Sequence, residues 1–287
     1  MRKKRDTHFL SILCMFKNES HIIKEWVQHY MKEGVDHFYL LDNGSTDNYL
    51  KEIENNFSNI SIIHDTRPGT QGFLYTDFVR SKLITSEWLL VVDMDEFVYA
   101  KNGFNTIKDF LKQKCEKYNQ IIIPMAVFTS NNYIQQPSSV IKSFTERKRA
   151  SKLEKTKAII RVVDPLEQIT MMVCAAHIPG ITVASDLKRT INTDRSTKIK
   201  TTDILREASE DIFRDSFLMG NHYTIQSYDM FWSKLDRYAG HSIHAYCDKR
   251  DCRYCRVPEA HYKRVWGLGH RGRKIEDDIL ATKEYNE

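Results

Sequence analysis

The sharpest feature of this 287-residue chain is Trp88-Leu-Leu-Val-Val-Asp93-Met-Asp95-Glu96-Phe97. It opens with an apolar run that predicts a buried strand, and the run ends in acidic residues. Side chains at positions i and i+2 of a strand point to the same face, so we expect Asp93 and Asp95 to converge while Met94 turns into the core. Two carboxylates at the open end of a strand are ligands that suit a hard divalent cation.

Strand and helix signals alternate on the N-terminal side of this stretch. Apolar residues recur at helical spacing from Ile22 to Met31, and Gly34 is placed to end that helix. Asp47 can cap a short helix that follows the second strand. Strands separated by helices at this spacing predict an α/β fold with a mostly parallel sheet. The expected strands cover residues 9–16, 37–41, 60–63 and 88–92, and a further helix covers 71–86.

The C-terminal side of the chain carries less regular patterns. We expect a strand at 217–219 that turns at Gly220-Asn221, and then a helix that begins near Ser227. The other expected elements are a helix over 105–118, strands over 120–125, 157–163 and 169–175, and polar loops over 130–143 and 182–210.

Polar residues follow each predicted strand at the edge where the parallel strands end. Sheets of this kind bind ligands at the carboxyl ends of their strands. Asn18 and Glu19 follow the first strand, and Asp42 closes the second. The Asp42 carboxylate could accept hydrogen bonds from a nucleoside base or a ribose hydroxyl, or it could serve only in an Asx turn.

Composition limits the classes of partner. The net charge is +5, with both signs mixed along the chain, which argues against a nucleic-acid partner. No run approaches the ~20 apolar residues of a membrane-spanning helix, and the apolar run behind the basic N-terminus reads as a strand rather than a signal peptide. We therefore expect a cytoplasmic protein with reduced cysteines, whose basic and aromatic segment 264–274 could contact an anionic membrane surface only weakly.

Three groups of motifs, in this order along the chain, carry a family resemblance. The first comprises Lys17-Asn18-Glu19, Glu25-Trp26, His29-Tyr30, Gly34-Val35 and residues 42–47. The second is Val92-Asp-Met-Asp-Glu-Phe97, and the third is Asn221-His222-Tyr223 followed by Ser227, Phe231, Lys234 and Arg237. Together they resemble the family-2-like and family-92-like glycosyltransferases, with the second group similar to the DxDEF metal motif of those enzymes.

The resemblance implies a GT-A fold, which is an α/β fold with a mostly parallel central sheet flanked by helices. It places the catalytic domain over residues 1–245 and leaves a basic C-terminal extension over 246–287. The implied enzyme moves a sugar from a nucleoside-diphosphate sugar, for which we expect a UDP-sugar, to a glycan or another hydroxyl acceptor. The implied cofactor is Mn²⁺ or Mg²⁺, and the implied stereochemistry is inversion.

The resemblance also implies roles for individual residues. Carried over by position, Asp93, Asp95 and His222 hold the metal, and the histidine favours Mn²⁺ over Mg²⁺. Lys157 matches a family lysine near the nucleotide, although a salt bridge would explain it equally well. Inversion requires a base for the acceptor hydroxyl. The remaining candidates are Asn18, Glu19 and Asp42 on the nucleotide side, and Asp186, Asp164 or His177 as the base.

Two other classes of function compete with this one. A metal-dependent nucleotidyltransferase would share the carboxylates at the sheet edge, but it usually adds a glycine-rich phosphate loop, and Lys17-Asn18-Glu19 contains no glycine. A non-enzymatic sugar- or nucleic-acid-binding module could be built on zinc held by Cys247, Cys252 and Cys255 with His244 or His261.

Overall fold

The computed structural model describes most of the chain in two compact units. The first unit comprises residues 1–125, 150–220 and 285–287, and the second comprises 126–149 and 221–284. No helix in the described part of the chain is long and apolar enough to cross a bilayer. The described residues are 8–53, 58–67, 71–81, 83–116, 118, 120–149, 156–162, 169–173, 178–181, 190–192, 210–238 and 273–285.

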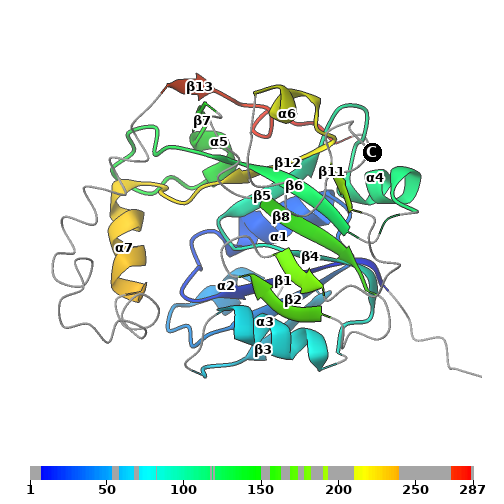
Figure 1. Ribbon diagram of the computed structural model, residues 1–287. Coiled ribbons are helices and arrows are strands. Elements are labelled where there is room, and N and C mark those ends of the chain that lie inside the picture. Colours follow the sequence, from blue (N-terminus) through cyan, green and yellow to red (C-terminus); the bar gives the residue numbers. More distant parts are fainter. Residues whose placement is uncertain are drawn as a thin grey trace, which may run out of the picture. The chain divides into compact units, whose positions relative to one another are not determined.

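Four parallel strands form one side of the main sheet, as the sequence predicts. They are β1 (His8–Phe16), β2 (His37–Asp42), β3 (Ile60–His64) and β4 (Ser86–Val91), and they lie in the order β3-β2-β1-β4 (Figure 1). β1 pairs with both β2 and β4, and its last residue lies opposite Asp42. The carboxyl ends of β1, β2 and β3 therefore meet at one edge, where their polar residues gather.

On the other side of the sheet, one strand runs antiparallel to both of its neighbours, and the sequence patterns did not show this. β8 (Thr156–Arg161) runs antiparallel to β4 and to β6 (Gln120–Val127). The order continues through β12 (Leu218–His222) to β5 (Glu96–Ala100). A short strand, β11 (Thr190–Asn192), lies within the segment 182–210 that was expected to be a polar loop, and it pairs with β6. The small pair β9 (Ile169–Val173) and β10 (Ile178–Ile181) is antiparallel.

Helix α1 (Ile23–Lys32) packs on one face of this sheet in the first unit. Trp26 is fully buried, and its ring lies 5.9 Å from that of Phe38 on β2. Gly34 ends the helix as predicted, with a φ of 87° and with the Val35 amide donating back to the Tyr30 carbonyl. A β-carbon at Gly34 would lie 2.6 Å from that of Lys108, so only glycine fits there.

Helix α3 (Gln71–Arg80) borders the core cluster on the other face of the parallel strands. The predicted helix over 71–86 is therefore too long, because residue 86 already begins β4 and pairs with His8. Alternate residues of the strands contribute to this core, so the strands are buried on both faces. The cluster comprises Leu13, Tyr39, Leu41, Tyr75, Phe78, Val79, Ile84, Leu89, Val91 and Ile160.

The first unit contains three further helices, and the start of one of them is capped as a sequence motif would suggest. Thr106 caps α4 (Ile107–Lys114) in a reciprocal capping box with Asp109. Asp47 does not cap α2 (Tyr49–Ile53), contrary to the prediction, because its carboxylate accepts from the Ser20 amide at 2.7 Å. The unit also contains α6 (Glu210–Asp215).

The second unit contains α5 (Val140–Ser143), β7 (Glu146–Lys148), α7 (Tyr228–Tyr238) and β13 (Lys274–Glu276). α5 lies within the segment expected to be a loop. α7 begins where predicted, and the Ser227 hydroxyl accepts from the Met230 amide at 3.2 Å. β13 pairs with β7, and Arg147 and Asp277 form a buried ion pair beside them.

Candidate active site

The acidic stretch after β4 is a turn, and not the extended strand that the sequence predicted. β4 ends at Val91 and β5 begins at Glu96, and the Glu96 amide donates to the Asp93 carbonyl at 3.2 Å. The argument that alternate residues share a face therefore does not apply to Asp93 and Asp95. Met94 is only 3% exposed, so it does turn into the core as expected.

Helix α1 holds the backbone of this turn. The Trp26 indole N–H donates to the carbonyls of Asp93 and Glu96, both at 3.1 Å. The Tyr30 hydroxyl donates to the Glu96 carbonyl at 2.9 Å and accepts from the Val98 amide. Directly after α1, the Glu33 carboxylate accepts from the Ala100 amide at 3.1 Å. The face of α1 that was predicted to be apolar therefore also supplies the hydrogen bonds that hold the backbone of the turn.

Lys157 on β8 forms a buried ion triad with two carboxylates of the turn. Its ammonium lies 2.7 Å from Glu96 Oε2 and 3.1 Å from Asp93 Oδ2. The Lys157 side chain is 3% exposed and that of Glu96 is 1% exposed. Burial alone would lower the pKa of Lys157, but the charges of Asp93 and Glu96 raise it above its ordinary value. Lys157 therefore forms the kind of salt bridge that was considered for it from the sequence.

Glu96 is the site residue that sequence reasoning missed. Besides pairing with Lys157, its carboxylate accepts from the Asp93 amide at 2.9 Å. The signal was present in the sequence, since Glu96 is the only charged residue in an otherwise apolar strand that continues to Ala100. A carboxylate is rarely placed at such a position unless it is paired.

The side chain of Asp93 is also engaged from helix α3. Gln71 donates to Asp93 Oδ1 at 2.6 Å and to the Tyr75 hydroxyl at 3.2 Å. The Tyr75 hydroxyl in turn accepts from the Met15 amide on β1. This chain of hydrogen bonds links Asp93 to the core on the α3 side, while Lys157 links it to β8.

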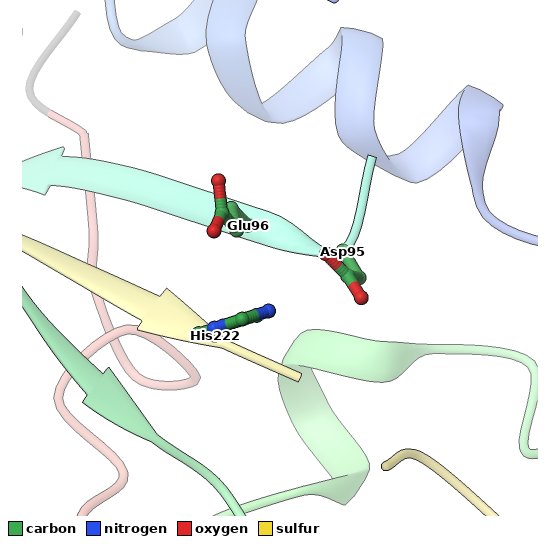
Figure 2. A group of neighbouring side chains, drawn as sticks. All are labelled: Asp95, Glu96 and His222. Atoms are coloured by element: carbon green, nitrogen blue, oxygen red, sulfur yellow. The ribbon is translucent and has the colours of Figure 1, made fainter. Parts of the chain in front are cut away.

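One group of ligand-type side chains lies close enough together to hold a metal ion, within the part of the chain described. Ligand atoms of Asp95, Glu96 and His222 lie within 4.8 Å of one another. Figure 2 shows these side chains, from the turn before β5, from the start of β5 and from the end of β12. Two predicted ligands, Asp95 and His222, belong to this group, whereas Asp93 does not and Glu96 takes the third position.

His222 reaches its place because β12 continues through it. The predicted turn at Gly220-Asn221 is wrong, since the strand extends to residue 222. Gly220 lies against Val98 of β5 and Met125 of β6, and the chain enters the second unit directly after it. His222 is 4% exposed, and its Nε2 lies 2.7 Å from the Thr224 hydroxyl.

Asn18 joins the loops that follow β1 and β2. It has a φ of 55°, a conformation that asparagine tolerates better than most residues. Its side-chain oxygen accepts from the backbone amides of Thr46 and Asp47, and its backbone amide donates to the Ser45 hydroxyl. In these contacts Asn18 shapes the edge of the sheet. Glu19, beside it, is 7% exposed, and its carboxylate lies 3.7 Å from His21.

Asp42 lies buried at the end of β2, as the sequence predicts. One carboxylate oxygen accepts from the Ser45 amide at 2.8 Å, and the other lies 3.1 Å from the Tyr49 hydroxyl and 3.0 Å from His64 Nδ1. Burial raises the pKa of Asp42, but these hydrogen bonds outweigh burial and lower it below its ordinary value. Asp42 is thus an ionised group fixed at the sheet edge, and it accepts from the amide three residues further along its own loop.

The remaining candidates lie outside the described residues. They are the three candidate bases, Asp164, His177 and Asp186, the cysteine group of Cys247, Cys252 and Cys255, and the boundary expected at 245.

The strand order and the carboxylate turn define an α/β protein with a candidate metal site beside its parallel strands. The family model of glycosyltransferase family 92 matches residues 10–198, so the chain belongs to this family, and its fold is the GT-A fold. A family 92 protein of Ricinus communis is 27% identical over 119 residues, which are 40% of this chain and 21% of that protein. A second, from Oryza sativa subsp. japonica, is 24% identical over 38% of this chain and 19% of its own length. The chain thus spans about a fifth of the length of these curated relatives.

Two solved structures are similar at low identity. Staphylococcus aureus TarS 1–349 is 14% identical, with 96% of this chain and 72% of that chain covered and a TM-score of 0.42. Glucosyl-3-phosphoglycerate synthase of Mycobacterium tuberculosis, in complex with Mn²⁺, UDP and glucosyl-3-phosphoglycerate, is 11% identical, with 62% of this chain and 64% of that chain covered and a TM-score of 0.35. At these TM-scores, neither bears on the chemistry of the site.

Proposed function

We propose that this chain transfers a sugar from a nucleoside-diphosphate sugar, with UDP as the nucleotide, to a hydroxyl group of a glycan acceptor. Membership of glycosyltransferase family 92 supports the reaction class. The observation that carries the proposal for this site is the group of Asp95, Glu96 and His222 beside the carboxylate turn. Sugar donors of this class carry a diphosphate, and a carboxylate-rich site needs a cation before it can hold one.

The residues of the group fit a divalent cation. Two carboxylates and an imidazole are oxygen and nitrogen ligands, which suit Mn²⁺ better than Mg²⁺. From this group we propose Asp95 and His222 as ligands, and we propose Asp93 of the DxD motif, which lies outside the group, as the third. Both Asp93 oxygens already accept hydrogen bonds, from Gln71 and Lys157, so Asp93 would bind a cation while keeping at least one of these partners. When bound, the cation would neutralise the departing diphosphate.

The side chains around the cation would then orient the donor. Asp42 and the Asn18 loop stand at the ends of β1 and β2, where we propose that the nucleoside binds, with Glu19 beside it. Lys157 lies buried behind the turn, so we assign it to positioning Asp93 and Glu96. The base that takes the acceptor proton in an inverting reaction is proposed among Asp186, Asp164 and His177.

Release of UDP from a panel of UDP-sugars, with Mn²⁺ present, tests the function. We expect turnover with at least one sugar, its loss in EDTA and its recovery when Mn²⁺ is added back. Asp95→Ala should abolish turnover, while Asp211→Ala, which changes an exposed carboxylate on α6, should not. Undiminished turnover in EDTA, or in Asp95→Ala, would contradict the proposed site.

A further inference from the structure

An exposed apolar surface stands at the start of α7 in the second unit. Tyr133, Ile134 and Tyr228 are 40%, 68% and 38% exposed. They are three of the six large hydrophobic side chains that are exposed in the described part of the chain. Trp232 follows one helical turn after Tyr228, with its ring 6.3 Å away at an interplanar angle of 73°. We call these four residues the aromatic platform.

The platform is held in place by the helix that it borders. The Tyr133 carbonyl accepts from the Tyr228 amide and the Ile134 carbonyl accepts from the Asp229 amide, both at 3.0 Å. These are amides at the start of α7, which have no partner within the helix. The Tyr133 ring also packs edge-on against Phe144 at 5.6 Å. The side chains are therefore displayed on a fixed backbone.

A second set of hydrogen bonds, made by the Gln136 side chain, also joins the two segments that carry the platform. Gln136 donates to the Gln226 side chain at 2.9 Å and accepts from the Ser227 hydroxyl at 2.9 Å. Asn131 and Asn132 adopt φ values of 45° and 61°, which form the turn that presents Tyr133. Such conformations are uncommon for residues other than glycine and persist only where the surroundings enforce them.

The platform is continuous with the strand that carries His222. The Phe128 amide donates to the His222 carbonyl at 3.0 Å, and the Phe128 ring lies 5.0 Å from that of Tyr223. The two segments that leave this contact, 128–134 and 222–228, end together at the platform. A ligand on the platform would thus lie on two chain segments, of which one begins at the proposed metal ligand His222 and the other at its hydrogen-bond partner Phe128.

The segments that carry Tyr133, Ile134 and Tyr228 contain few formal charges, and the charged residues that follow them in sequence are Lys142 and Asp229, both exposed. Residues 121–141 and 216–228 contain no Asp, Glu, Lys or Arg, although such residues make up 28% of the chain. Asn132 and Gln135 are exposed beside the apolar side chains. Aromatic faces bordered by neutral hydrogen-bonding groups match a sugar ring, which has an apolar C–H face and a rim of hydroxyl groups. Anionic lipid or nucleic acid would require a cluster of cations, and residues 121–141 and 216–228 contain no Lys or Arg.

We propose that the aromatic platform binds an uncharged portion of the acceptor glycan, with sugar rings packed on Tyr133, Tyr228 and Trp232. This inference rests on the proposed function and names the acceptor side of the same reaction. It predicts that the acceptor is an oligosaccharide with neutral residues, and that contacts away from the reacting hydroxyl contribute to its affinity.

The test is binding of the whole chain to an array of neutral and acidic oligosaccharides, followed by titration of the best neutral one. Tyr133→Ala and Tyr228→Ala should each weaken that binding about tenfold or more, while Tyr133→Phe keeps it near the wild-type value. The matched controls are Ile279→Ala, an exposed hydrophobic residue of the same unit, and Leu83→Ala, and neither should change it. UDP binding in the presence of Mn²⁺ should be unaffected in all five variants, and this shows that they are folded.

Several results would overturn the proposal. The first is that the wild type binds no neutral oligosaccharide, and the second is that Tyr133→Ala and Tyr228→Ala leave glycan binding unchanged. The third is that these two variants lose self-association, or lose binding to neutral phosphatidylcholine vesicles, rather than glycan binding. If the wild type does not bind UDP, the proposed function is contradicted. If it binds UDP but no neutral glycan, only the proposed role of the platform is contradicted.

Discussion

Replacing Lys157 by Met removes the only cation of the ion triad while keeping most of the apolar stem. Glu96, with 1% of its side chain exposed, then keeps its charge without the ammonium that lies 2.7 Å away in the native protein. Asp93 is less affected, since it is 28% exposed and retains the hydrogen bond from Gln71. Most of the free-energy cost therefore falls on one buried carboxylate.

Breaking a buried pair by removing one partner costs about 3–5 kcal/mol, because the remaining charge is uncompensated. We expect Lys157→Met to lower the free energy of unfolding by this amount, a large fraction of the total stability of an ordinary domain. If the charges of Lys157 and Glu96 are both removed, no uncompensated charge remains buried at position 96. The double variant Lys157→Met/Glu96→Gln should therefore be more stable than Lys157→Met alone.

Urea denaturation at pH 7, followed by circular dichroism, measures these differences. Arg214→Met is the control, since Arg214 makes ion pairs with Asp211 and Asp215 at a side-chain exposure of 66%, and it should leave the midpoint unchanged. A loss below about 1 kcal/mol in Lys157→Met, or a double variant as unstable as the sum of its two single variants, would refute the view that the triad is a coupled buried unit.

Three further predictions concern other parts of the first unit. Asp42→Ala should weaken binding of UDP with Mn²⁺ in a calorimetric titration, and unchanged affinity would place the nucleoside elsewhere. Burial and the neighbouring charge of His8 lower the pKa of His37, so the folded state takes up that proton less readily than the unfolded chain. Stability should thus fall as the pH drops below about 6.5 and through the folded-state pKa, and urea midpoints across this range should show a shallower slope in His37→Gln. Gly220→Ala places a β-carbon 2.2 Å from Met125 Sδ and should destabilise the protein by about 1–3 kcal/mol, with partial recovery when Met125→Ala is added; a neutral thermal shift would mean that β12 has room there.

The parallel half of the fold was predictable because its signals are local. Each strand there is a short apolar run, α1 has a regular apolar face, and Gly34 ends it. The end of α3 was not predictable from periodicity, because the residues after Arg80 are compatible with helix and only pairing with β1 places residue 86 in a strand. Asp47 was assigned to a helix cap for a similar reason, since its partner Ser20 is distant in sequence.

The site was only partly predictable because its contacts span the chain. The acidic motif gave the right segment, but its turn depends on Trp26 and Tyr30, which lie more than 60 residues earlier. Lys157 and Glu96 pair across 61 positions of sequence, and the pattern at either residue shows only a charge in an apolar strand. A resemblance between motifs supplied Lys157, and only the geometry showed what its ammonium contacts.

The hydrogen bonds from Trp26 and Tyr30 have a consequence for how such a site can change over evolutionary time. They end on main-chain carbonyls of residues 93 and 96, which every amino acid possesses. The path of the turn therefore does not depend on the carboxylate of Asp95. Substitutions at this position can alter or abolish ion binding while the frame persists, so descendants of such a chain could exchange one chemistry for another, or lose it, without first losing their shape.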